Sequence, residues 1–168
     1  MSQPKTEPNQ QKPLLDQLVL LLRGGQAHVT FDDAVKDFPA DLRGVVPEKL
    51  SHSAWQVLEH LRIAQRDILH FSAPPTGGYQ PMQWPDDYWP KSPEPPGPHA
   101  WDQSIAAICK DRERFEALLL KPGADLYKPF RWGEGQNLLR EALLIADHNA
   151  YHLGELVALR RLLGIWNP

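Results

Sequence analysis

Apolar residues recur at spacings of three and four in four stretches of this chain, and segments rich in proline and glycine separate these stretches. This spacing places side chains on one face of an α-helix, whereas half-buried strands alternate at every second residue. The helices predicted in this way cover residues 14–23, 51–71, 100–120 and 136–163. Thr30 can cap a short additional helix over 31–38, and Ser51 or Ser53 can cap the second main helix. The pattern predicts an all-α fold, a four-helix bundle.

The longest connection, residues 73–100, joins the second and third main helices and contains nine prolines. Its aromatic residues are Tyr79, Trp84, Tyr88 and Trp89. Loops of this length inside a compact domain are uncommon and are often functional. Two roles stay open for it: a proline-stiffened strap whose aromatic rings cover the bundle, or a lid or interface.

The beginning of the chain differs in composition from the rest. Residues 1–13 are polar and rich in proline and amide side chains, which predicts a disordered tail before a single domain over residues 14–168. No apolar segment resembles a secretory signal or is long enough to span a bilayer, and Cys109 is the only cysteine. We therefore expect a cytoplasmic protein without a membrane partner, and Cys109 as a small core residue rather than a nucleophile.

Charge argues against one class of partner. The formal net charge is −3, and the lysines and arginines are scattered among acidic residues. Proteins that bind nucleic acids usually concentrate positive charge on one face, so we expect no nucleic-acid partner. Arg112 interrupts the apolar stripe of the third helix. We expect it at the edge of the stripe with its charge towards solvent, or, as the alternative, as a buried charge aimed at a functional site.

His148 and His152 stand one turn apart on the fourth predicted helix. At about 100° per residue, His152 lies about 40° from His148, and Glu155 lies about 20° away on the other side. The apolar residues that share this stripe are Ile145, Leu159, Leu162 and Trp166. Burying polar groups is unfavourable unless they are paired or bind a metal. Both imidazoles can turn towards one ion, because side chains at this spacing lie about 5–6 Å apart at Cβ.

A metal site is one of two interpretations of this pair. Two core histidines can instead be satisfied by side chains and backbone carbonyls. A metal would need a further ligand, and His60 is the best candidate, because it lies in the middle of the second helix at the edge of its apolar face. The remaining histidines lie near helix ends or in loops and are weaker candidates: His28, His52, His70 and His99.

Several segments resemble the DinB-like (DinB/YfiT) superfamily. The run HNAYHLGE at 148–155 resembles the family's last helix, and SAWQVLEH at 53–60 resembles its second helix. The resemblance extends over nearly the whole chain from about Leu14, and includes YWP at 88–90 and WDQS at 101–104. It implies a four-helix bundle, often dimeric, in which three histidines hold a divalent metal.

The resemblance implies that the metal ligands here are His60, His148 and His152. We expect Zn or Ni, with Fe or Mn as alternatives, because histidine ligands suit several divalent ions. The family includes transferases and isomerases that use small thiols, so a low-molecular-weight thiol is a second expected cofactor. Glu155 stands where many relatives carry glutamine. Three residues could contact the ligands or line the pocket: Glu155, Trp55 and Tyr151.

Two hypotheses for function follow. The first is a metal-dependent enzyme, a thiol-dependent S-transferase or a related hydrolase or isomerase, acting as a homodimer on an unknown small molecule. The second is a non-catalytic, stress-related binding or scaffold protein with a structural or vestigial metal site. An open coordination position would favour the first and a closed shell of four ligands the second. The fold alone does not choose between them.

Overall fold

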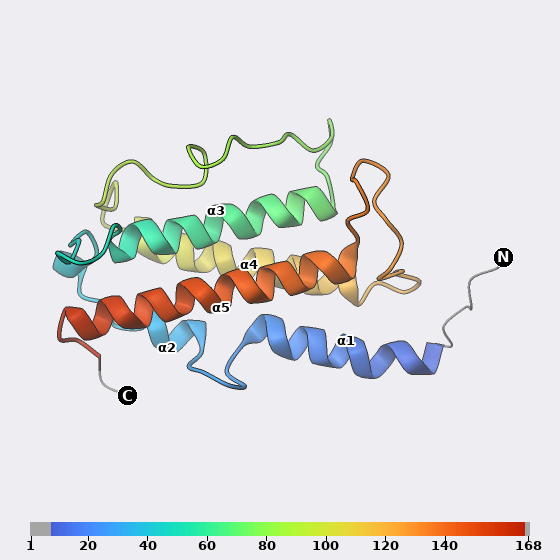
Figure 1. Ribbon diagram of the computed structural model, residues 1–168, viewed down its shortest axis with the longest axis horizontal. Helices are drawn as coiled ribbons and strands as arrows, with labels where there is room; N and C mark the ends of the chain where they lie inside the picture. The colour runs from blue at the N-terminus through green and yellow to red at the C-terminus, as the bar shows by residue number, and fades with distance from the viewer. Residues whose placement is uncertain (1–7, 167–168) are drawn as a thin grey trace.

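The computed structural model describes residues 8–166, and its regular elements are helices (Figure 1). They are α1 (Pro8–Arg23), α2 (Phe31–Val35), a short 3-10 helix η1 (Ala40–Leu42), α3 (Ala54–Ser72), α4 (Ala100–Leu119) and α5 (Leu138–Leu162). Residues 8–166 contain no β-strand, only an isolated bridge between Gly24 and Thr30. The four long helices α1, α3, α4 and α5 pack into a bundle, which confirms the predicted fold class. None of the described helices combines the length and apolar character needed to cross a bilayer.

The first helix starts earlier than its apolar pattern indicates. α1 begins at Pro8, so residues 8–13, which the sequence assigns to a disordered tail, are helical, while residues 1–7 lie outside the described part of the chain. Pro8 is tolerated because the amide groups of the first turn have no intrahelical acceptor, whereas Pro13 lies inside the helix and cannot donate a helical hydrogen bond. Further along α1, Leu18 and Leu22 are buried in the core and dock the helix on the bundle.

Side-chain caps fix where the helices carrying the candidate ligands begin. Ser53 accepts a hydrogen bond from the backbone N–H of Gln56, and the Gln56 side chain accepts one from the backbone N–H of Ser53. This reciprocal capping box selects Ser53 over Ser51 as the cap of α3. Asn137 caps α5 by accepting from the backbone N–H of Arg140 at 2.9 Å.

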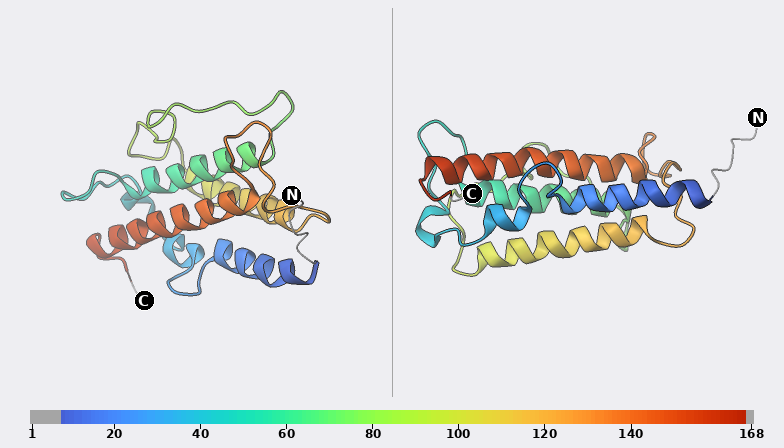
Figure 2. Two further views of the ribbon diagram at one scale, coloured as in Figure 1. Left: turned by 45° about the vertical axis from the view of Figure 1, so that its right-hand side comes forward. Right: turned by 90° about the horizontal axis from the view of Figure 1, so that it is seen from below.

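Helix direction explains why the proline-rich connection is long. α3 and α4 run in the same direction along the bundle, whereas α5 and α1 run the opposite way, as the colour gradients in Figures 1 and 2 show. The chain must therefore return over the whole of α3, about 29 Å at 1.5 Å per residue, before α4 can begin. Residues 73–99, which we call the strap, make this return along the outer side of α3.

The strap is held on α3 by hydrogen bonds that follow one face of the helix. These are Ser53 Oγ to the Pro93 carbonyl (2.5 Å), Gln56 Nε2 to the Pro90 carbonyl (3.0 Å), and the Tyr88 and Tyr79 hydroxyls to Asp67 (2.6 and 2.9 Å). Proline has no N–H to donate, but its carbonyl accepts hydrogen bonds like that of any other residue, as Pro90 and Pro93 do here. The strap therefore extends the buried surface of α3 beyond the apolar stripe in its sequence.

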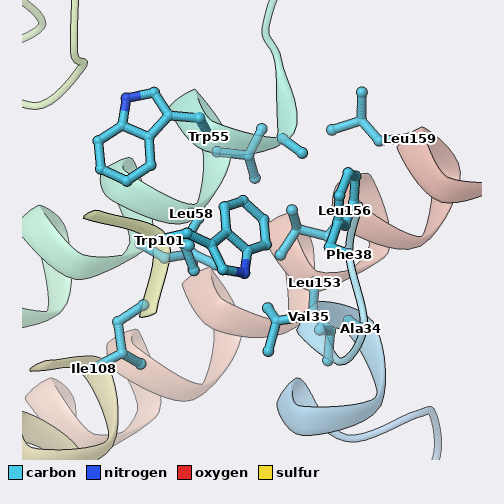
Figure 3. Packing of buried hydrophobic residues seen from close by; sticks show 13 residues of the cluster. Ala34, Val35, Phe38, Trp55, Leu58, Trp101, Ile108, Leu153, Leu156 and Leu159 are labelled. Carbon is cyan, nitrogen blue, oxygen red and sulfur yellow. The ribbon is translucent and has the colours of Figure 1, made fainter. Parts of the chain in front are cut away.

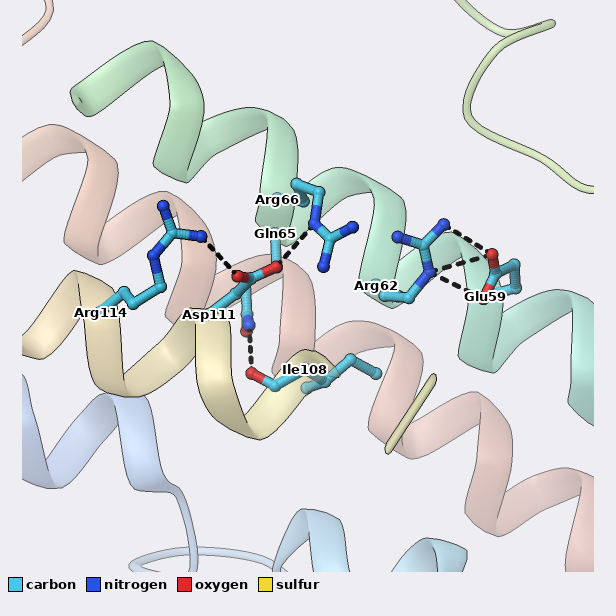
Figure 4. Close-up of polar contacts among 7 residues, drawn as sticks. All are labelled: Glu59, Arg62, Gln65, Arg66, Ile108, Asp111 and Arg114. Carbon is cyan, nitrogen blue, oxygen red and sulfur yellow. Dashed lines mark hydrogen bonds and ion pairs between the residues drawn. The ribbon is translucent and has the colours of Figure 1, made fainter. Parts of the chain in front are cut away.

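The core has two apolar clusters, one towards each end of the bundle. The first gathers residues of α2, α3, α4 and α5, including Leu58, Trp101 and Leu156 (Figure 3). The second gathers residues of α1, α3, α4 and α5, including Phe115 and Ile145. Polar side chains lie along the α3–α4 seam, where Arg66 and Arg114 both pair with the buried Asp111 (Figure 4).

Candidate metal centre

Three histidines from two helices come together beside the strap. His60 projects from α3, and His148 and His152 project from α5. Each histidine offers one ring nitrogen as a ligand atom, and these three nitrogens all lie within 4.8 Å of one another. The Nε2 atoms of His60 and His148 are 3.0 Å apart. Two nitrogens bound to one tetrahedral ion, each at about 2.0–2.1 Å, would lie about 3.3 Å apart. The three histidines could therefore hold a metal ion.

Hydrogen bonds at the opposite ring nitrogens fix the tautomers of two of these histidines. His60 Nδ1 lies 2.9 Å from the carbonyl oxygen of Tyr88, and His152 Nδ1 lies 3.0 Å from Glu155 Oε2. A carbonyl or carboxylate oxygen only accepts, so each Nδ1 carries the hydrogen and donates it. The Nε2 atoms of His60 and His152 then keep free lone pairs. Metal-binding histidines usually have such an oxygen partner on the second nitrogen.

His148 is held less firmly. Its Nδ1 atom is buried and has no hydrogen-bond partner within residues 8–166. In the protein without a metal, His148 Nε2 can donate to the lone pair on His60 Nε2 at 3.0 Å, which is the arrangement expected of two paired core histidines. With a metal bound, His148 would carry its hydrogen on Nδ1 and turn the Nε2 lone pair to the ion.

Burial keeps two of the imidazoles neutral. It lowers the pKa of His60 to about 4, although the hydrogen bond to the Tyr88 carbonyl acts in the opposite direction. Burial likewise lowers the pKa of His148 to about 4, and repulsion from His152 and His60 adds to this, while the Asn149 side chain acts in the opposite direction. A neutral imidazole is the form that binds metals, so both rings are ready to act as ligands near neutral pH.

Trp89 of the strap covers the site on one side. Its ring stacks on His60 with centroids 3.9 Å apart and planes at 4°, and its other face stacks on His52 at 3.9 Å and 12°. His60 is consequently 1% exposed, although its sequence position is at the edge of the apolar face. His52 lies at the margin of the site, with Nδ1 3.9 Å from Glu155 Oε1. The sequence indicated that the aromatic rings of this connection could cover the bundle, but it did not place Trp89 or the Tyr88 carbonyl at the histidines, because nothing in it gives the path of the strap.

The remaining candidates occupy different surroundings. Glu155 contacts His152 directly, as described above. The Tyr151 ring packs edge-on against His152 with centroids 4.9 Å apart, and its side chain is 74% exposed. Trp55 is buried in the first apolar cluster. Burial raises the pKa of the Cys109 thiol, which disfavours the nucleophilic thiolate. The histidines outside the cluster of three are His28, His52, His70 and His99.

Three histidines converge from two helices of a bundle, and this arrangement is that of a candidate metal-binding protein. Sequence comparison identifies the family. A sequence profile of the DinB superfamily matches residues 25–156. The chain therefore belongs to the DinB superfamily. Searches against curated proteins and against solved structures gave no significant match.

Proposed function

We propose that this protein is a metal-dependent enzyme of the thiol-dependent transferase kind, or a related hydrolase or isomerase, with His60, His148 and His152 as the metal ligands. One observation carries the proposal. The Nδ1 atoms of His60 and His152 are engaged by oxygen acceptors at 2.9 and 3.0 Å, which leaves the Nε2 lone pairs for a shared ion. This arrangement matches the carboxylate–histidine–metal and carbonyl–histidine–metal pairs of known sites.

The surroundings suit a site that admits a small molecule. The described residues bring three histidines together and no fourth ligand of the same kind, as catalytic rather than structural sites do. If His60, His148 and His152 held a divalent ion, the ion would lower the pKa of a bound water or thiol and supply a nucleophile near neutral pH. Trp89 shields His60 from water, whereas Glu155 is 22% exposed, so the α5 side of the site reaches solvent.

Metal analysis tests the ligand assignment. The protein is purified without an affinity tag, and Zn, Ni, Fe and Mn are measured in the wild type, in His148→Ala and in His99→Ala. His99 lies outside the cluster of three, so it provides a matched control. We expect about one metal per chain in the wild type and in His99→Ala, and loss in His148→Ala with unchanged helicity. Equal metal content in all three proteins would remove the proposed site.

A thiol titration separates the two functional hypotheses. Co²⁺-loaded protein is titrated with N-acetylcysteine while the visible spectrum is recorded. A sulfur-to-metal charge-transfer band that saturates, and that His148→Ala lacks, supports thiol-dependent chemistry. Metal retention without any spectral response would instead support the non-catalytic protein with a structural metal.

A further inference from the structure

A cavity of about 100 Å³ lies between α1, α3, α4 and α5, on a side of α3 and α5 different from that of His60 and His148, and His28 is among the residues that line it. Leu61 and Gln65 line it from α3, and Asn149 and Leu153 line it from α5. Each is about 100–140° around its helix from His60 or His148. The C-terminal end of α1, the connection to α2, and α4 complete the walls. This cavity is therefore separate from the candidate metal centre.

The wall is mostly apolar but contains polar atoms that have no partner. Its apolar lining includes Leu22, Phe31, Leu61, Ile108, Ala146 and Leu153. Across residues 8–166, Arg112 Nε and Asn149 Oδ1 are buried without a hydrogen-bond partner, and both residues line the cavity. A buried polar atom left without a partner is unfavourable, and few such atoms occur in native proteins. Their position at one cavity suggests a bound molecule that satisfies both.

Hydrogen bonds nearby determine which atom of Asn149 is left over. Gln65 Nε2 donates to the Ile108 carbonyl at 2.7 Å (Figure 4), so Gln65 Oε1 is an acceptor. Asn149 Nδ2 donates to that Oε1 at 2.8 Å. The remaining amide atom of Asn149 is its carbonyl oxygen, which accepts only. A ligand that contacts this oxygen must therefore offer a donor, such as a hydroxyl group, in competition with the neighbouring side chain of His148.

The charges around Arg112 favour an anion. Glu116 is the buried acid nearest to it, but Arg23 holds both Glu116 oxygens at 2.6 to 3.2 Å. Arg112 Nε is 3.9 Å from Glu116 Oε1, beyond hydrogen-bond distance. Glu113 is also on α4 but is exposed to solvent, where water screens its charge. Arg112 is therefore less fully paired than Arg23, and its Nε keeps a donor for an anion in the cavity.

We propose that this cavity binds a small hydroxycarboxylate with a short aliphatic body. The carboxylate accepts from the Arg112 guanidinium, the hydroxyl donates to Asn149 Oδ1, and the aliphatic part packs against the apolar wall. An apolar cavity of about 150 Å³ holds the six carbons of a benzene ring, so about four non-hydrogen atoms of the ligand fit within this volume and the others lie towards its exposed rim at Ala150. The proposal does not depend on the function proposed for the histidines.

Calorimetric titration with 3-hydroxybutanoate tests the proposal. The protein is titrated as purified and again after chelation and dialysis, because carboxylates also bind metal ions. We expect the same affinity in both forms, and binding weaker by about tenfold or more for 3-hydroxybutanamide, which lacks the charge. Butanoate, which lacks the hydroxyl, is also expected to bind more weakly.

Variants locate the binding in the cavity. Arg112→Met should weaken 3-hydroxybutanoate binding by about tenfold or more. Lys110→Met removes the same charge from an exposed position on α4 that does not line the cavity, and should change affinity less than about twofold. Ala146→Leu should fill the cavity and abolish binding. If that variant fails to fold, Ala150→Leu at the exposed rim of the cavity replaces it in the same experiment. Absence of binding at millimolar concentration, or equal affinity in wild type, Arg112→Met and the folded cavity variant, would overturn the proposal.

Discussion

Glu155 offers the sharpest test of the proposed metal centre, because it contacts one ligand at the nitrogen that faces away from the ion. Its Oε2 atom accepts from His152 Nδ1 at 3.0 Å, and its side chain is 22% exposed. Removing such an oxygen partner typically weakens metal binding by about 10- to 100-fold, or about 1.4–2.7 kcal/mol. Since water can reach Glu155 and partly replace it, we expect Glu155→Ala to fall in the lower part of this range, at about 10- to 30-fold.

The measurement is a competition titration with a chelator of known affinity, using Zn²⁺ and Ni²⁺ in parallel. Glu155→Gln keeps an acceptor oxygen but loses the charge. Because neutral hydrogen bonds are about half as strong as charge-assisted ones, the expected loss is about threefold. The order of affinities should be wild type, then Glu155→Gln, then Glu155→Ala.

Asp147→Ala provides the control for charge alone. Asp147 is exposed on α5, next to His148 in sequence, and its removal changes the net charge by the same amount as Glu155→Ala. Salt screens exposed charges, so we expect a change below about twofold. If Glu155→Ala and Asp147→Ala weaken metal binding equally, the hydrogen bond to His152 does not orient a ligand and the reasoning fails.

Three further predictions concern stability and protonation. In metal-free protein the pKa values of His60 and His148 are about 4, below the 6.5 of the unfolded chain. The unfolded state therefore binds more protons between these values, and urea titrations should show stability falling by up to about 3 kcal/mol per ring as pH drops from 6.5 towards 4. A flat profile would contradict this. Trp89→Ala should uncover His60 and raise its pKa towards 6.5 in an NMR titration, whereas no rise would show that Trp89 does not desolvate the ring. Leu156→Ala, at a fully buried position, should lower the free energy of unfolding by about 2–5 kcal/mol, and a loss below about 1 kcal/mol would refute the packing.

Local periodicity was enough to predict most of the fold. The spacing of apolar residues located α3, α4 and α5 to within a few residues of their observed bounds, because capping and burial both act within one or two turns. The same reasoning placed His148 and His152 together, since residues four apart on a helix are neighbours whatever surrounds them. α1 was less well bounded, because its early residues lack the apolar pattern that marks a docked helix.

Contacts between distant segments could not be predicted in the same way. Helical geometry allowed His60 as a third ligand, and the family resemblance singled it out, but its near-complete burial depends on Trp89, which is 29 positions further along the chain. The partner of His60 Nδ1 is a backbone carbonyl, and every residue has one. No side-chain pattern can identify which carbonyl will serve. The direction of α4 relative to α3 also decides where the strap runs, and that direction is a property of the whole bundle.

The strap links the protonation of the site to the fold of the bundle. Tyr88 donates its hydroxyl to Asp67 and offers its carbonyl to His60, so one residue is bound at two points on α3. Trp89, the next residue, is held between the rings of His52 and His60. Movement of the strap would therefore free His60 Nδ1 and hydrate its ring at the same time. Because a free ring can exchange tautomers and a hydrated one takes up a proton more readily, the strap favours the form of His60 whose Nε2 lone pair is available.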